Sequence, residues 1–175
     1  MRIRQMTVGD VDGCLRLDSS YRTGYVWHLV EHMTESRIEV VLERTRLPRN
    51  VEVDYPCALA DLAEECRTSD CFLVADHLGQ IQGCINLRQR RWTNTAWIEY
   101  CAVDRTCRSQ GVGSLMLEAG EAWARNARLR QVIMPLQTKN DLAITAALAR
   151  GYLFSGYLDR YFNNEDIGLL FMKSV

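Results

Sequence analysis

The sequence predicts a single α/β domain built on a mixed sheet. Three observations carry this prediction: two strand-like segments form a hairpin in the middle of the chain, helical segments separate other strands, and one strand runs through a glycine turn into a helix. The predicted order is β-α-α-β-α-β-β-β-α-β-α-β-β. A chain of 175 residues is long enough for one substantial core, so we expect one domain over residues 1–175.

The first four elements follow from apolar periodicity and helix-start signals. Residues 1–7 alternate and predict a strand, and Asp10 is a residue type that begins helices, here a short one. Residues Gly24–Met33 carry apolar side chains at helical spacing, which predicts a second helix. Residues 36–48 alternate and contain β-branched side chains, so they predict a strand that ends near Pro48.

The middle of the chain reads as a helix followed by three antiparallel strands. Residues 58–69, which follow a proline, predict a short helix. Residues 71–75 and 81–90 flank a turn around Gly79 and predict a hairpin. Residues 95–104 continue with a further strand, so this part of the sheet should be antiparallel.

The last part of the chain alternates helices with strands. Residues 113–129 predict an amphipathic helix of about four turns. A strand follows at 131–138, and the helix predicted at 140–151 ends on a glycine, the usual residue at that end. Two final strands are predicted at 152–162 and 167–174.

Composition and cysteine spacing restrict the classes of function. Net charge is −1, so no strong field draws the chain to nucleic acid or to a membrane, although the basic run at 88–92 leaves room for a local patch. Residues 1–10 are polar and lack the apolar core that is typical of a signal peptide, and no apolar run reaches ~18 residues. Seven cysteines, an odd number without a C-x-x-C pair, predict reduced, mostly buried thiols and a cytoplasmic protein.

A glycine turn predicts a site for a phosphate-bearing ligand. The buried strand 97–104 leads into Arg108–Ser114, where Gly111 and Gly113 precede an apolar helix. Backbone N–H groups at a helix start lack partners, the dipole makes that end positive, and glycines let a ligand approach closely. The turn lacks the Gly-Lys-Ser/Thr of a Walker loop and has Met116 at the third glycine position of a dinucleotide fingerprint.

Two motifs resemble those of the GCN5-related N-acetyltransferase (GNAT) superfamily. Arg108, Gly111 and Gly113 match the cofactor motif Gln/Arg-x-x-Gly-x-Gly/Ala, and residues 102–104 match its usual Ala-Val-Asp lead-in. The resemblance covers nearly the whole chain, least so residues 21–66, and the spacing is similar to streptothricin-acetyltransferase-like members. The second motif, Asn-x-x-Ala ending in Gly-Phe or Gly-Tyr, is matched by Asn140, Ala143, Gly151 and Tyr152.

This resemblance implies a mixed, mostly antiparallel central sheet flanked by helices on both faces, with acetyl-CoA as cosubstrate and no metal. It also implies a small-molecule primary amine as acceptor, and a homodimer is a candidate assembly. The pantetheine arm would pair with the backbone of the strand before the turn, and Asn140 would hold it from the other side. The implied cofactor residues are Cys101, Ala102, Val103, Arg108, Ser109, Gln110, Gly111, Val112, Gly113, Ser114 and Asn140.

Catalysis needs a base for the amine and an acid for the leaving thiolate. Glu99 lies two residues before Cys101, which predicts a shared face, and it resembles the carboxylate that many family members carry on this strand. Many members supply the acid from a tyrosine four residues before the glycine of the second motif, where this chain has Ala147. The acid is therefore absent, supplied by Tyr157 or Tyr161, or replaced by water.

Alternative interpretations remain beside these. His28–His32 reads H-x-x-E-H, which some zinc proteases use on a helix, but a third ligand is needed and the chain is short for a protease. Without metal, these histidines, with Tyr21 and Trp27, would lie on a surface helix or on the wall of the acceptor pocket. Asn140 could simply cap a helix, Glu99 could form an ion pair, and Ala147 leaves open a non-catalytic acyl-CoA-binding protein.

Overall fold

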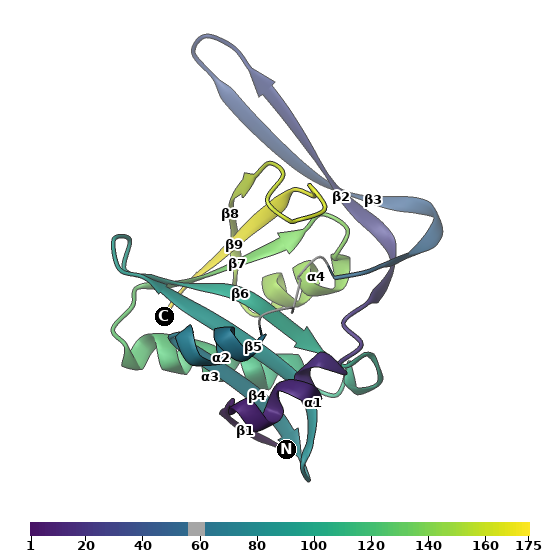
Figure 1. Cartoon of the computed structure of the whole chain (residues 1–175). Coiled ribbons are helices and arrows are strands. Elements are labelled where there is room, and N and C mark those ends of the chain that lie inside the picture. The colour runs from purple at the N-terminus through teal and green to yellow at the C-terminus, as the bar shows by residue number, and fades with distance from the viewer. Residues whose placement is uncertain (56–61) are drawn as a thin grey trace.

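The computed structural model describes residues 1–55 and 62–175, and its centre is a seven-stranded mixed sheet (Figure 1). The strand order is β1-β4-β5-β6-β7-β9-β8, and only the β6–β7 pairing is parallel among the described residues. The strands are β1 (Arg2–Gln5), β4 (Cys71–His77), β5 (Gln80–Arg90), β6 (Thr95–Val103), β7 (Gln131–Gln137), β8 (Leu153–Leu158) and β9 (Gly168–Ser174).

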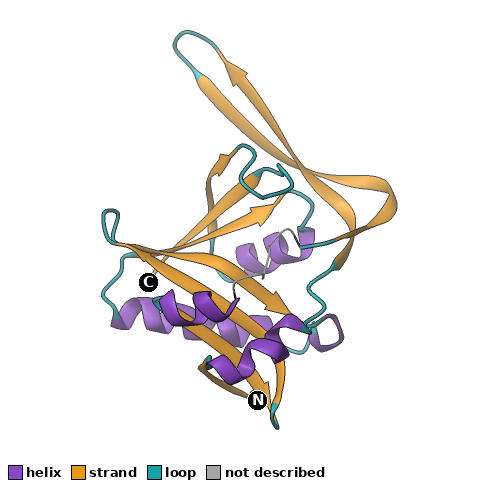
Figure 2. Cartoon of the chain, in the orientation of Figure 1, coloured by secondary structure: helices purple, strands orange, loops and turns teal. Residues whose placement is uncertain are grey.

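Helices cover both faces of this sheet (Figure 2). The main core lies between the sheet and two helices, α3 (Val112–Asn126) and α4 (Asp141–Ala149). A second core on the other face joins the sheet to α1 (Val11–Leu15) and α2 (Leu62–Thr68). The predicted fold class is therefore confirmed. The first four residues of the helix predicted at 58–69 lie outside the described part of the chain.

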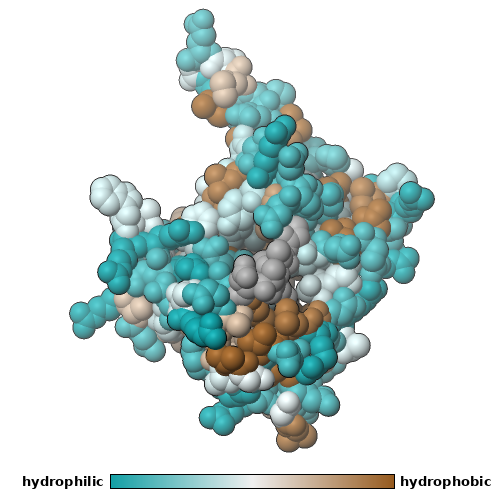
Figure 3. All heavy atoms as spheres, in the orientation of Figure 1, coloured by the Kyte–Doolittle hydropathy of each residue, from teal (hydrophilic) through white to brown (hydrophobic). Residues whose placement is uncertain are grey.

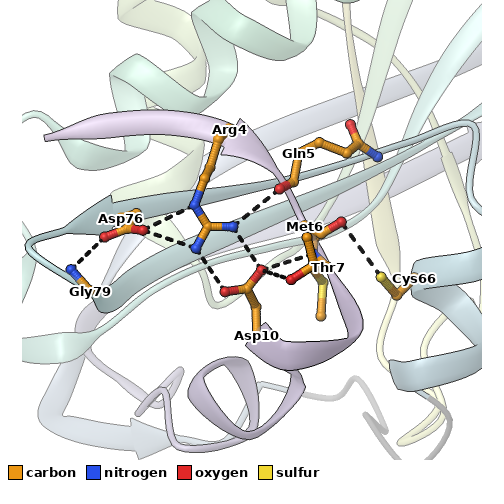
Figure 4. A network of polar contacts seen from close by, with 8 residues as sticks. All are labelled: Arg4, Gln5, Met6, Thr7, Asp10, Cys66, Asp76 and Gly79. Carbon is orange, nitrogen blue, oxygen red and sulfur yellow. Dashed lines mark hydrogen bonds and ion pairs between the residues drawn. The ribbon is translucent and has the colours of Figure 1, made fainter.

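Arg4 ties the N-terminal strand to the helix that follows it (Figure 4). Its guanidinium donates to both carboxylate oxygens of Asp10 at 2.7 and 2.8 Å and to Asp76 on β4 at 3.0 Å. The hydrogen bonds from Arg4 hold the pKa of the Asp10 carboxyl far below its usual range. Asp10 thus marks the start of the first helix, as predicted, but it does so through a salt bridge that fixes α1 against β1 and β4.

The segment predicted as a second helix, Gly24–Met33, is a strand, and this prediction was wrong. It belongs to β2 (Tyr21–Met33), which pairs antiparallel with β3 (Ile38–Val53) in a two-stranded ribbon that projects from the body (Figure 1). The partner strand decides the conformation: Trp27 and Leu29, at a spacing of two, pack against the main core. Short apolar segments fit both periodicities, and tertiary pairing selects between them.

The ribbon also accommodates the proline at which the strand was predicted to end. β3 passes through Pro48 because residues 47–50 form an irregular stretch opposite Gly24, between the pairs Tyr25↔Arg46 and Thr23↔Val51. A residue without a backbone N–H costs no ladder hydrogen bond in such a stretch. The strand predicted at 152–162 is shorter than expected, since β8 ends at Leu158.

Candidate active site

The strands β6 and β7 separate beyond Trp97 and leave one edge of β6 unpaired. Their parallel pairing joins only residues 95–97 to residues 131–133. From Ile98 to Val103 β6 pairs with β5 alone, while β7 continues to Gln137 against β9. An extended ligand with amide groups can add to such an edge through main-chain hydrogen bonds. The predicted cofactor contacts at Cys101, Ala102 and Val103 lie on this open edge.

The turn after β6 presents a row of backbone N–H groups at the start of α3. Gly111 caps the helix with φ of 85°, a left-handed value that suits glycine. In the described part of the chain, no acceptor lies in hydrogen-bond geometry for the N–H groups of Ser109–Ser114. A Cβ added to Gly111 would meet no atom within 4 Å, so the backbone is open here. This arrangement fits a phosphate group.

The side chain of Arg108 stabilises the turn through backbone carbonyls. Its Nε donates to Val103 at 3.0 Å, its Nη1 to Ser20 at 2.6 Å and its Nη2 to Asp18 at 3.0 Å. Burial lowers the pKa of this guanidinium. The arginine of the first motif therefore holds the loop at 18–20 against the end of β6, and its contribution to an anion site is positional.

The second motif begins α4 on the opposite side of the gap between β6 and β7. Asn140 is the helix N-cap, with Oδ1 accepting from the N–H of Ala143 at 3.2 Å. The capping interpretation is therefore correct for its oxygen, and its Nδ2 donates to no residue in the described ranges. Asn140 can cap the helix and still offer an N–H donor to a ligand.

The next residue, Asp141, anchors the ribbon to this helix. It is buried and receives both Nε and Nη2 of Arg44 at 2.7 and 2.8 Å, together with Nε1 of Trp27 at 3.0 Å. The hydrogen bonds from Arg44 lower the pKa of the Asp141 carboxyl. The ribbon is thus joined directly to the helix that the second motif begins.

Glu99 occupies a β-bulge, which changes its geometry from the one predicted. On β5 Asn86 pairs with Tyr100 and Leu87 pairs with Ile98, so Glu99 opposes neither residue. The extra residue interrupts the alternation of side chains along β6. Glu99 and Cys101 were predicted to share a face of the sheet, and this prediction was wrong.

The bulge turns Glu99 towards the α2 face of the sheet. Its Oε1 accepts from Nη2 of Arg90 at 2.9 Å, and Arg90 shares the face of Arg88, whose guanidinium reaches Glu65 on α2. Cys101 instead packs against the main core on the α3 face. Glu99 and Cys101 therefore lie on opposite faces of the sheet, beside the unpaired edge of β6.

The two tyrosines predicted as candidates for the general acid lie on either side of the end of β8. Tyr161 lies in the loop after the strand and helps to line a cleft of about 560 Å³ together with Arg90 and Trp97. Tyr157 lies within β8, and its hydroxyl donates to Glu31 on the ribbon at 2.7 Å. The hydrogen bond to Glu31 raises the pKa of Tyr157. Tyr161, and not Tyr157, thus lines a cleft with Arg90, the ion-pair partner of Glu99.

Sequence reasoning missed a polar network at the far end of β7. The hydroxyl of Tyr21 donates to Oε1 of Gln137 at 2.9 Å, and Nε2 of Gln137 donates to Asp166 at 2.7 Å. The Asp166 carboxylate fixes the amide orientation, so the Tyr21 proton is committed to Gln137, and burial raises the pKa of Tyr21. A glutamine directly after the apolar residues 132–136 was the available signal.

The structure bears on the zinc motif and on the reactivity of Cys101. His28 and His32 lie on β2, where residues four apart are separated by roughly 13 Å, so the shared helical face needed for the zinc motif does not exist. The described residues hold no group of three potential metal ligands. Burial raises the pKa of the Cys101 thiol to about 12, the opposite of what a thiolate nucleophile needs.

The cysteines and helices of the described ranges bear on other expectations. Six cysteines are free, and Cys14, Cys71 and Cys84 are buried, as predicted, while Cys57 lies outside these ranges. In residues 1–55 and 62–175, each helix is too short or too polar to span a bilayer.

Comparisons with known proteins identify the fold and the family. The model of the acetyltransferase (GNAT) family matches residues 38–152. The crystal structure of nourseothricin acetyltransferase superposes with a TM-score of 0.84 at 18% identity, covering 99% of this chain and 97% of that chain. At 22% identity and a TM-score of 0.78, the chain also matches a protein of Bacillus anthracis str. Ames assigned as a streptothricin acetyltransferase, in complex with acetyl coenzyme A, with 99% of each chain covered.

A third similar structure is Ard1 from Thermoplasma volcanium. It has 23% identity and a TM-score of 0.68, covering 99% of this chain and 97% of that one. No curated protein sequence matches the chain. At these identities the solved structures establish the fold, and the family match covers the turn and the second motif.

Proposed function

Because this chain belongs to the acetyltransferase (GNAT) family, we propose that it transfers the acetyl group of acetyl-CoA directly to a primary amine of a small molecule. The observation that carries the proposal is the unpaired edge of β6 from Ile98 to Val103, which leads to the open N–H groups at Gly111. These two features together suit a ligand with an amide-containing arm and a pyrophosphate. One of the similar structures contains acetyl coenzyme A.

Each part of acetyl-CoA has a complementary feature in this arrangement. The pyrophosphate would lie on the N–H groups of Ser109–Ser114, where the dipole of α3 favours negative charge. The pantetheine amides would pair with Cys101, Ala102 and Val103, and Nδ2 of Asn140 is available from the other side. A backbone N–H near Cys101 would polarise the acetyl carbonyl as its oxygen gains charge.

The transfer requires two proton movements. The amine nitrogen attacks the thioester carbonyl, a C–N bond forms, and the C–S bond breaks with its electron pair on sulfur. Glu99, directly or through water, takes the proton that the amine loses. The thiolate takes a proton from Tyr161 or from water. Because Arg90 holds the Glu99 carboxylate at 2.9 Å, an incoming ammonium group would compete with Arg90 for it.

A second candidate function is supported by Ala147. This residue is fully buried in α4, so the position at which many family members carry their acid is filled by core packing. A protein that binds acyl-CoA without turnover would have the same feature.

We also propose that the protein is cytoplasmic, since its described cysteines are free thiols.

Turnover with a panel of amines tests the proposal. The protein is incubated with acetyl-CoA and, separately, an amino acid, an aromatic amine, a polyamine, a streptothricin and a short peptide, and free thiol release and product mass are measured. We expect thiol release that depends on one amine and matches formation of its acetylated product. Tight binding of acetyl-CoA without turnover on any amine would favour the non-catalytic alternative.

A further inference from the structure

A cleft of about 560 Å³ lies between the turn that joins β5 to β6 and the end of β8. Its volume is in the range of small-molecule sites. Three of its lining residues are aromatic, two are arginines, and none is an aspartate or glutamate. The residues that line it are Gln89, Arg90, Arg91, Trp92, Thr93, Trp97, Leu158 and Tyr161.

This cleft adjoins the place where the chemistry is proposed. Trp97 is the last residue of β6 that pairs with β7, so the cleft begins where the two strands separate. Arg90 lies over the ring of Trp97, 5.9 Å from its centroid, and its guanidinium bonds to Glu99 at 2.9 Å. A small molecule in the cleft would therefore have one end beside the carboxylate in the bulge.

The walls of the cleft suit a flat apolar body. Trp92 borders the cleft and is 96% exposed, although such a large aromatic side chain is usually at least partly buried, so its ring is available to pack on a ligand. Trp97, Tyr161 and Leu158 supply the facing apolar surfaces. Aromatic side chains stack on planar groups and on apolar chains with little loss of conformational freedom.

The charge of the cleft is positive and partly uncompensated. The charge of Arg90 is balanced by Glu99. The guanidinium of Arg91 is exposed and makes no ion pair or hydrogen bond with the residues that the structure describes. A polycationic ligand would meet this charge unfavourably, whereas a carboxylate could accept two parallel hydrogen bonds from the Arg91 guanidinium.

We infer that this cleft is the acceptor site, and that it takes an amine with an apolar or aromatic body and a carboxylate close to the amino group. The inference rests on the proposed function and specifies its substrate class. In this arrangement Arg91 binds the carboxylate, Trp92 and Trp97 contact the body, and the amino group lies beside Glu99. Arg91 and Trp92 are then specificity-determining residues for the acetyl transfer.

A matched pair of amines tests this assignment. L-phenylalanine and phenethylamine share the aromatic body and the primary amine and differ in the carboxylate. We expect kcat/KM to be roughly tenfold or more higher for phenylalanine, because a charge-assisted bidentate contact is lost with phenethylamine. The Arg91→Gln variant should lose most of this preference, because the group that binds the carboxylate is removed. The control Arg125→Gln, at an exposed arginine on α3, should keep the preference.

A binding measurement separates this inference from the proposed function. N-acetylphenylalanine and N-acetylphenethylamine, the corresponding products, are titrated into the protein with CoA present and followed by tryptophan fluorescence. Tighter binding of the carboxylate-bearing product, reduced by Arg91→Gln, supports the cleft even if no amine is turned over. Acetylation of phenethylamine or a polyamine in preference to phenylalanine would overturn the substrate class while leaving acetyl transfer intact. Equal binding of both products, or an equal effect of Arg125→Gln, would also overturn it.

Discussion

The turn at Gly111 and the β2–β3 ribbon both border the gap between β6 and β7, yet different interactions determine their structures. The turn depends on local conformation: a left-handed glycine, an adjacent strand and a helix start. The ribbon depends on partners far away in the chain, since β2 pairs with β3 and its base is held by Asp141 on α4. Figure 3 shows hydrophobic atoms on the projecting ribbon among hydrophilic ones, and Met33 and Ile38 near its outer end are each 67% exposed.

This difference explains which features could be predicted from the sequence. A local motif carries its own geometry in adjacent residues, so the turn and the helix after it were identified at the right positions. The conformation of Gly24–Met33 was misassigned because its apolar side chains fit a helix as well as a strand, and only the partner strand decides. Substitutions at the turn, at the bulge, in the cleft and at the base of the ribbon therefore test this difference between local and distant interactions.

The largest effect is expected at the turn. Gly111→Asp would place a carboxylate and a Cβ where the pyrophosphate is proposed to lie, at a position whose φ of 85° disfavours side chains. We expect CoA affinity, measured by calorimetry, to fall by roughly 100-fold or more, since charge repulsion replaces an anion-binding N–H row.

The matched control is Gly79→Asp in the turn between β4 and β5. Gly79 has φ of 84° and, like Gly111, no atom within 4 Å of an added Cβ, so the substitution imposes similar backbone strain away from the turn at Gly111. Both variants should lose similar stability, and only the first should lose CoA. Unchanged CoA affinity in a folded Gly111→Asp protein would move the cofactor site elsewhere.

The next largest effect is expected at the bulge. Glu99→Gln keeps the shape and removes the proton acceptor, so kcat/KM should fall by roughly 100-fold at neutral pH. The loss should shrink at high pH, where the amine is already neutral. Initial rates across a pH series measure it, with Glu118→Gln on the exposed side of α3 as the control for removal of one charge. Identical pH profiles for Glu99→Gln and wild type would make Glu99 a structural partner of Arg90.

A smaller effect is expected from the tyrosine in the cleft. If the hydroxyl of Tyr161 protonates the thiolate, Tyr161→Phe should lower kcat by roughly tenfold. Tyr157→Phe removes a similar hydroxyl that is committed to Glu31, so it should leave kcat within about twofold. Single-turnover rates distinguish the two variants. Near-normal rates in both would assign the proton to water.

Some features of the candidate site could be predicted from the sequence and others could not, and the geometry of the site explains the difference. Residues proposed to act through their backbone, such as Gly111 and Cys101, were predicted from motifs that resemble those of the GNAT superfamily. The directions of side chains could not be predicted in this way. One inserted residue in β6 moved Glu99 to the other face of the sheet, and the shorter β8 left Tyr161 in a loop. Register and bulges depend on neighbouring strands, so a single sequence does not determine them. The hydrogen bond from Tyr21 to Gln137 was missed for the same reason, because the two residues are more than 100 positions apart.

The smallest effect is expected at the base of the ribbon, which is held by a contact between residues far apart in the chain. Arg44→Gln breaks the contact with Asp141, and we expect it to lower Tm by roughly 2–4 °C, because the carboxylate stays buried with Trp27 as its remaining side-chain donor among the described residues. Arg37→Gln makes the same substitution near the outer end of the ribbon, where the pair with Glu39 is exposed, and should shift Tm by less than about 1 °C.

The pH dependence of these two Tm values completes the test. Since Arg44 lowers the pKa of Asp141, the pair stabilises the fold above the unfolded carboxyl value of about 3.9, and this contribution is lost as pH falls through the lower folded value. The Tm difference between wild type and Arg44→Gln should therefore be full at neutral pH and narrow in acid. A difference that persists unchanged at acid pH would mean that Arg44 holds the ribbon by packing over Tyr25, whose ring centroid lies 3.6 Å from its guanidinium carbon, and not by its charge.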